Sequence, residues 1–247
     1  MDFLKELGVQ SYCFRGFKDN EKVVDLVKAC GLSKIELWRG HGHFEDPSGY
    51  ADVIATYRDA GVEIVSMGQQ TFSGEVREEQ AWFEFITAAG AHTITSNFAV
   101  DSVPESLYKA EAMAEMHGVR LAIHNHGGRH WLGTSDMLRY VFEHSSPQIG
   151  LCLDTAWAID SREDPIQMAR EFADRLYGVH LKDFVYDRAR NPEDVIIGEG
   201  NLKLGDFLET LSDIGFDGTF VLEYEGDVSD PVPALRECVA AVEAALP

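Results

Sequence analysis

Metal-ligating and titratable side chains follow several short apolar runs of this sequence. The four that end or interrupt consecutive runs in the second half of the chain are His124, Asp154, His180 and Glu223. Imidazole and carboxylate are the mixed ligand set of catalytic Mn, Zn, Co or Fe sites, whereas a structural zinc site favours cysteine. These residues are therefore candidate ligands of one catalytic divalent metal.

Each candidate also has an ordinary structural explanation. His180 could be a hydrogen-bonded histidine of the core, and Asp154 could cap the turn that follows it. Glu223 is harder to explain in this way, because a carboxylate that closes a buried parallel strand needs a partner. Four such residues at four neighbouring strand ends are far rarer by chance than any one of them, so the joint pattern favours a site.

Glycines divide the chain into repeated units, in each of which a helical stretch is followed by a short apolar or β-branched run. Most successive glycines lie about 30 residues apart, the length of one strand–helix unit. The expected strands are residues 9–12, 34–38, 62–65, 92–95, 119–124, 151–154, 179–182 and 219–223. Amphipathic segments between them, such as 82–86 and 207–214, predict helices.

Eight strands that alternate with helices in 247 residues predict an α/β fold, a single-domain (β/α)8 TIM barrel over residues 1–247. A doubly wound open sheet is the alternative, although it usually has fewer strands. No Gly-x-Gly-x-x-Gly follows the first strand and no Walker loop occurs, so a dinucleotide or P-loop site lacks support. Loops are expected at residues 40–49, 68–74 and 184–200.

The charge balance limits the partners. Lys and Arg number 21 against 42 Asp and Glu, a formal charge of −21. A negative field repels phosphate backbones and anionic lipid, so neither nucleic acid nor a membrane is expected as a partner. The four cysteines lie far apart without a CxxC pair, and residues 1–6 do not open a signal peptide. A cytoplasmic protein with reduced thiols is expected.

The motifs at these strand ends resemble, in their order and spacing, the xylose-isomerase-like TIM-barrel superfamily. The matching segments are residues 121–126, 153–157, 179–183, 198–200 and 218–223, and residues 8–15 look like the opening strand of such proteins. The superfamily contains sugar-phosphate isomerases and epimerases, ketose 3-epimerases, hydroxypyruvate isomerases, inosose dehydratases and family 2 AP endonucleases. The resemblance extends over nearly the whole chain.

The resemblance implies a metal site with one departure. Isomerases and epimerases of the group hold a divalent metal with Glu, Asp, His and Glu from strands 5 to 8. Asp154, His180 and Glu223 match the last three, whereas His124, with His126 close behind, stands where the first Glu would be. Either histidine could be the strand-5 ligand. The loss of one carboxylate should make the metal a stronger Lewis acid, and Mn²⁺ is favoured over Zn²⁺, Co²⁺ or Mg²⁺.

The leading hypothesis is a metal-dependent isomerase or epimerase that acts on a sugar or polyol through an enediolate at the carbon next to a carbonyl. Glu223 or His126 is the expected base, and Lys182 the expected proton donor or ligand of a substrate oxygen. A His-Asn-His at this strand is similar to that of inosose-dehydratase-like members, so a keto-polyol dehydratase is the alternative. A non-catalytic sugar-binding barrel and an AP endonuclease, which would need a basic groove, are less favoured.

Further residues at the expected rim are candidate contacts for a small sugar or polyol. Aromatic faces suit the C–H surfaces of a sugar, and arginine suits hydroxyl or phosphate groups. The candidates are Arg15, Glu36, Trp38, Asn97, Arg129 and Trp157. The resemblance and the aromatic loop of residues 41–50 also predict a homo-oligomer.

Overall fold

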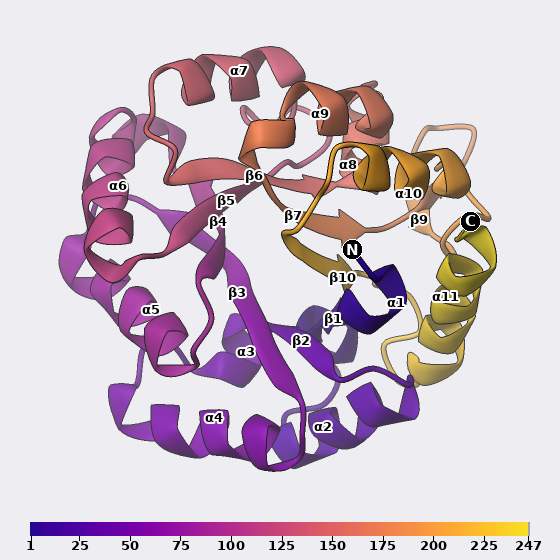
Figure 1. The fold of residues 1–247 in the computed structure, drawn as a ribbon, viewed down its shortest axis with the longest axis horizontal. Coiled ribbons are helices and arrows are strands. Elements are labelled where there is room, and N and C mark those ends of the chain that lie inside the picture. Colours follow the sequence, from indigo (N-terminus) through magenta and orange to yellow (C-terminus); the bar gives the residue numbers. More distant parts are fainter. Residues whose placement is uncertain (247) are drawn as a thin grey trace.

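Eight parallel strands close into a barrel in the computed structural model of the protein, which describes residues 1–246 (Figure 1). The order around the barrel is β1-β10-β7-β6-β5-β4-β3-β2. These strands are β1 (Leu7–Gln10), β2 (Lys34–Leu37), β3 (Glu63–Phe72), β4 (Thr93–Phe98), β5 (Arg120–His124), β6 (Ile149–Asp154), β7 (Leu176–Leu181) and β10 (Thr219–Leu222). The predicted single-domain (β/α)8 barrel is confirmed.

The helices form a ring outside the strands (Figure 1). They are α1 (Phe3–Glu6), α2 (Asn20–Ala29), α3 (Arg39–Gly42), α4 (Tyr50–Asp59), α5 (Val76–Ala88), α6 (Glu105–His117), α7 (Ser135–Glu143), α8 (Thr155–Asp160), α9 (Pro165–Glu171), α10 (Leu204–Asp213) and α11 (Val232–Ala245). Helix α6 ends at Gly118, whose φ of 64° is left-handed and suits glycine. Within residues 1–246 no helix combines the length and the apolar character that crossing a membrane requires.

The strands of the second half of the barrel are buried along their whole length. Every residue of β6 and β7 is buried, because helices cover the outer face and side chains from other strands fill the interior. Leu121, Leu151 and Val179 have no exposed surface and belong to the main hydrophobic core. Truncation of such a side chain to alanine typically costs about 2–5 kcal/mol. This core fixes the direction of the residues at the strand ends.

Strand β3 is longer than predicted. It continues to Phe72, so most of the loop expected at residues 68–74 is strand. Gly68 lies inside this strand, where a Cβ atom would come within 2.4 Å of the Cβ of Thr95 on β4. The glycine is therefore required by close strand packing and does not mark the end of the strand.

The segment after β7, expected as a loop, contains a two-stranded antiparallel hairpin of β8 (Phe184–Tyr186) and β9 (Pro192–Asp194). The buried carboxylate of Asp183 organises the return of the chain from this hairpin. It accepts hydrogen bonds of 2.8–3.0 Å from the backbone N–H groups of Gly198, Gly200, Asn201 and Leu202. A side chain at residue 200 would collide with it, because a Cβ there would lie 2.4 Å from Asp183 Oδ1.

Candidate active site

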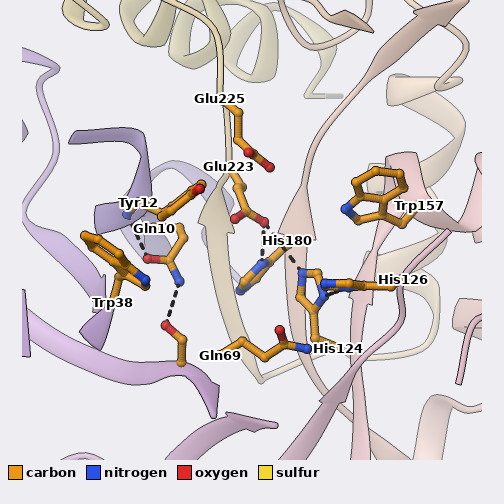
Figure 2. Close-up of a pocket in the computed structure, with 11 residues that line it drawn as sticks. Gln10, Tyr12, Trp38, Gln69, His124, His126, Trp157, His180, Glu223 and Glu225 are labelled. Atoms are coloured by element: carbon orange, nitrogen blue, oxygen red, sulfur yellow. Dashed lines mark hydrogen bonds and ion pairs between the residues drawn. The ribbon is translucent and has the colours of Figure 1, made fainter. Parts of the chain in front are cut away.

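A pocket of about 370 Å³ lies at the carboxyl ends of the barrel strands (Figure 2). Its lining comes from widely separated parts of the chain: Gln10, Tyr12, Trp38, Gly68, Gln69, His124, His126, Trp157, His180, Glu223 and Glu225. Active sites of (β/α)8 barrels lie at this end of the strands. The pocket is therefore the candidate active site.

The four predicted metal ligands lie together in this structure. Each of His124, Asp154, His180 and Glu223 is buried and offers one ligand atom, and these atoms lie within 4.8 Å of one another. The Nε2 atom of His124 is 3.4 Å from Asp154 Oδ2 and 3.6 Å from Glu223 Oε2. The Nδ1 atom of His180 is 2.9 Å from the same Glu223 oxygen. Two imidazoles and two carboxylates thus converge on one point.

Asp154 shows why the cluster suits a cation. Its Oδ1 atom accepts a 2.8 Å hydrogen bond from the N–H of Trp157. Asp154 therefore caps α8, as expected if its role were only structural. Its Oδ2 atom, however, is buried without a hydrogen-bond partner. Asn125 holds the backbone of Asp154 in place through hydrogen bonds of 2.8 and 3.0 Å. A buried oxygen without a partner costs about 1–3 kcal/mol, and a divalent metal between these side chains would satisfy it.

The charges of the cluster also suit a bound cation. Burial alone would raise the pKa of Glu223, but Lys182 and His180 hold that pKa well below its ordinary value. Burial alone would lower the pKa of His124, but hydrogen bonds to Asp154 and Glu223 raise it. The carboxylates therefore favour a positive charge at this point, which a proton supplies when no metal is bound.

His126 lies behind His124. The two Nδ1 atoms are 2.8 Å apart, and the Nε2 atom of His124 faces the carboxylates. Of the two strand-5 histidines, His124 is therefore the one in the cluster. Burial and the neighbouring His124 lower the pKa of His126 to about 4, so His126 is neutral near pH 7.

Lys182 is not among the residues that line the pocket. Its side chain is 1% exposed, its ammonium group pairs with Glu225, and it lies 3.6 Å from Asp194 Oδ1 on β9. Burial would lower the pKa of Lys182, but nearby carboxylates, first Glu223, raise it above its ordinary value. The predicted proton donor is thus a charged group held by two carboxylates.

Glu36, expected as a substrate contact, is fully buried and does not line the pocket. Its carboxylate accepts hydrogen bonds from Gln10 Nε2 at 2.6 Å, Ser66 Oγ at 2.6 Å and Thr95 Oγ1 at 2.7 Å. Its Oε1 atom lies 3.0 Å from His180 Nε2. This position suits support of His180 rather than contact with a substrate.

Aromatic side chains stand on opposite sides of the pocket. Trp38 and Tyr12 lie on one side and Trp157 on the other (Figure 2). The rings of Tyr12 and Trp38 meet edge to face with centroids 5.2 Å apart. The two tryptophans were predicted from the strand ends. Tyr12 was not selected, although it belongs to the first expected strand.

The other three expected contacts do not line the pocket. Arg15 donates hydrogen bonds to the carbonyl oxygens of Tyr12 and Glu225, and its guanidinium carbon lies 4.6 Å from the centre of the Tyr12 ring. Arg129 is exposed in the segment after β5, and Asn97 is half-buried in β4.

Sequence reasoning also missed several polar residues of the lining: Gln10, Gln69 and Glu225. A signal existed for two of them. Gln10 lies at the end of the first strand, and Glu225 follows Glu223 by two residues, the spacing that places side chains on one face of an extended segment.

Comparison with known proteins agrees with this architecture. Residues 24–244 match the model of the family described as xylose isomerase-like TIM barrel. The solved apo structure of 3-keto-D-glucoside 4-epimerase from E. coli superposes with a TM-score of 0.76 at 18% identity, and the match covers 97% of this chain and 99% of that one. At this identity the likeness shows the fold alone.

Two relatives match in sequence. The rhizopine catabolism protein MocC of Rhizobium meliloti is 30% identical over 138 residues, which are 50% of this chain but only 42% of that protein. An inosose dehydratase of Geobacillus thermodenitrificans (strain NG80-2) is 24% identical over 229 residues, which are 85% of this chain and 75% of the relative.

Proposed function

Because the chain belongs to the xylose isomerase-like TIM barrel family, we propose that it is a divalent-metal-dependent isomerase or epimerase of a sugar or polyol. The reaction would pass through an enediolate at the carbon next to a carbonyl. The observation that carries the proposal is the convergence of His124, Asp154, His180 and Glu223 at the pocket. Mn²⁺ is the favoured ion.

A divalent ion held by these four residues would supply Lewis acidity toward a substrate carbonyl. The protein supplies the base. Glu223 is ionised and lines the pocket, so it is placed to take the α-proton of the substrate. The N–H of Trp157 and the side chain of Asn125 keep Asp154 oriented, so that only one of its oxygens is free.

His126 is better suited to donate a hydrogen bond than to act as the base. If the Nε2 atom of His124 binds the metal, the proton of His124 is on Nδ1 and is donated to Nδ1 of His126. The proton of a neutral His126 is then on its Nε2 atom, which can donate to a substrate oxygen. The low pKa of His126 supports this neutral form.

A dehydratase that acts on a keto-polyol is the second candidate. The alignment with an inosose dehydratase over 85% of the chain favours it. The first step would be the same removal of a proton next to a carbonyl, and the loss of a β-hydroxyl group would then replace proton return.

The deciding experiment combines elemental analysis of protein purified without chelator with NMR of keto-sugars and 2-keto-myo-inositol in D₂O. The proposal expects about one divalent ion per chain and deuterium at the α-carbon of a substrate. An isomeric product indicates an isomerase or epimerase, and an unsaturated product indicates a dehydratase. Protein that neither retains nor responds to Mn²⁺ would contradict both candidates.

A further inference from the structure

We infer that the pocket accepts an uncharged sugar or polyol and excludes its phosphorylated and carboxylated counterparts. The inference rests on the proposed function, because it concerns the substrate of the same site. It begins with the side chains of the lining, among which no lysine or arginine occurs. Anion sites usually depend on arginine or lysine, or on free backbone N–H groups.

Two basic side chains close to the pocket, Lys182 and Arg15, are already engaged, and the Nζ atom of a third, Lys18, lies 5.5 Å from the centre of the Trp38 ring. Lys182 pairs with Glu225 and lies 3.6 Å from Asp194. The guanidinium of Arg15 is directed to two carbonyl oxygens, those of Tyr12 and Glu225. Neither cation is left to meet a phosphate or a carboxylate of a ligand.

Several backbone N–H groups in the loops after β7 and β10 are also occupied. Barrels of this type often bind phosphate with the loops after strands 7 and 8. Here the loop after β7 directs the N–H groups of Gly198, Gly200 and Asn201 to the carboxylate of Asp183. In the segment after β10, the N–H of Glu225 donates to Asp194 at 3.1 Å. Internal carboxylates thus accept from N–H groups that could otherwise donate to a phosphate.

Helix α8, which begins at the pocket, offers no free N-terminal site for a phosphate either. Helix α8 has six residues, and its N-terminal N–H from Trp157 is used by Asp154 Oδ1. A bound divalent metal would not reverse the balance either, because Asp154 and Glu223 together carry two negative charges. Glu36 behind the cluster is a further carboxylate, and the charge of Glu225 on the wall is balanced by Lys182.

The remaining lining suits a neutral polyol. The amide of Gln10 is already hydrogen-bonded within the protein, whereas the Nε2 atom of Gln69 is buried without a partner and can donate to a ligand. The aromatic faces of Trp38 and Trp157 can cover C–H surfaces from opposite sides (Figure 2). The amide, phenol and imidazole groups of such a lining can hydrogen-bond hydroxyl groups without a net charge on the ligand.

The test compares matched pairs of probes on the Mn²⁺-loaded protein: D-fructose with D-fructose 6-phosphate, and D-tagatose with D-tagatose 6-phosphate. Binding is followed by the fluorescence of Trp38 and Trp157, which needs no turnover, and 2-keto-myo-inositol and inorganic phosphate are added as single probes. The neutral member of a pair should bind at least tenfold more tightly, and phosphate should not bind. Equal or tighter binding of the phosphorylated member, or no saturable binding of any neutral probe, would overturn the inference.

Deuterium exchange on the same probes separates this inference from the proposed function. Selective binding of neutral probes without exchange would support the inference and count against the enzyme. Exchange confined to a phosphorylated probe would support the enzyme and contradict the inference.

A variant with one carboxylate removed tests whether local charge excludes phosphorylated ligands from the pocket. Asp194→Asn keeps an oxygen that can accept from the N–H of Glu225 but removes part of the charge that holds Lys182, so affinity for D-fructose 6-phosphate should rise about threefold to tenfold. The matched control is Asp217→Asn, which makes the same change in net charge at an exposed residue in the turn before β10, at the opposite end of the barrel. An equal rise in both variants would show that only the overall charge of the protein excludes phosphate, and would overturn the assignment to the pocket.

Discussion

The Nε2 atom of His180 lies 3.0 Å from the Oε1 atom of Glu36, a carboxylate with no exposed surface. The other ring nitrogen of His180, Nδ1, faces Glu223 at 2.9 Å. If the proton of His180 is on Nε2, beside Glu36, the lone pair of Nδ1 is left for a metal, the usual arrangement of a carboxylate behind a ligating histidine. Glu36 is thus a positioning residue for the cluster.

Glu36→Gln should weaken Mn²⁺ binding about 10-fold to 100-fold. The amide can still accept hydrogen bonds from Ser66 and Thr95, but it loses the charge that holds the proton on Nε2 of His180. Competition with a fluorescent chelator measures the affinity, and ¹⁵N NMR of the histidine rings reports the tautomer. An unchanged affinity would contradict the positioning role, and a less stable apo protein would then assign Glu36 a role in folding alone.

His180→Ala should abolish retention of the metal with little change in fold, because the residue belongs to the strand-end cluster and not to the hydrophobic core. Elemental analysis gives the metal content, and far-UV circular dichroism the fold. His92→Ala, at an exposed position just before β4, is the control and should retain its metal. Full metal content in His180→Ala would remove this residue from the ligand set.

The cluster of two histidines and two carboxylates could be predicted because each of its members ends or lies in a short apolar run. The glycine spacing locates the strands, and the carboxyl ends of parallel strands meet at one face of the barrel. The positions of His124, Asp154, His180 and Glu223 then follow without any knowledge of tertiary contacts.

The roles of Glu36 and Lys182 could not be predicted in the same way. Strand periodicity does not fix how deep a side chain lies, and the register between β2 and β3 shifts at Ile35 and Glu36. The pairing of Lys182 with Asp194 depends on the β8–β9 hairpin, whose second strand, Pro-Glu-Asp, has no apolar strand pattern. Long-range contacts of this kind decide which polar residues face the substrate.

Asp194 should give a measurable pH dependence of stability. Burial raises its pKa to about 6, although Lys182 opposes the shift. The folded protein therefore binds a proton more tightly than the unfolded chain, so this contribution to stability is complete below about pH 4 and is lost as the pH rises through 6. Urea denaturation from pH 4 to pH 8 should show a steeper decline for the wild type than for Asp194→Asn. Parallel profiles for the two proteins would contradict the assignment.

Glu223 should carry proton transfer as well as metal binding. The family resemblance implies that His124 stands in place of a glutamate, and of the two carboxylates in the cluster only Glu223 is among the residues that line the pocket. Glu223→Gln keeps an oxygen for the metal but removes the basic charge, and loss of a general base typically costs about 10²–10⁴-fold in rate. Partial metal occupancy should therefore persist while deuterium exchange at the α-carbon collapses. His124→Glu restores a second carboxylate and should retain the metal, with exchange at least as fast as in the wild type. Undiminished exchange by Glu223→Gln would transfer the role of base to another group that lines the pocket, first of all Glu225.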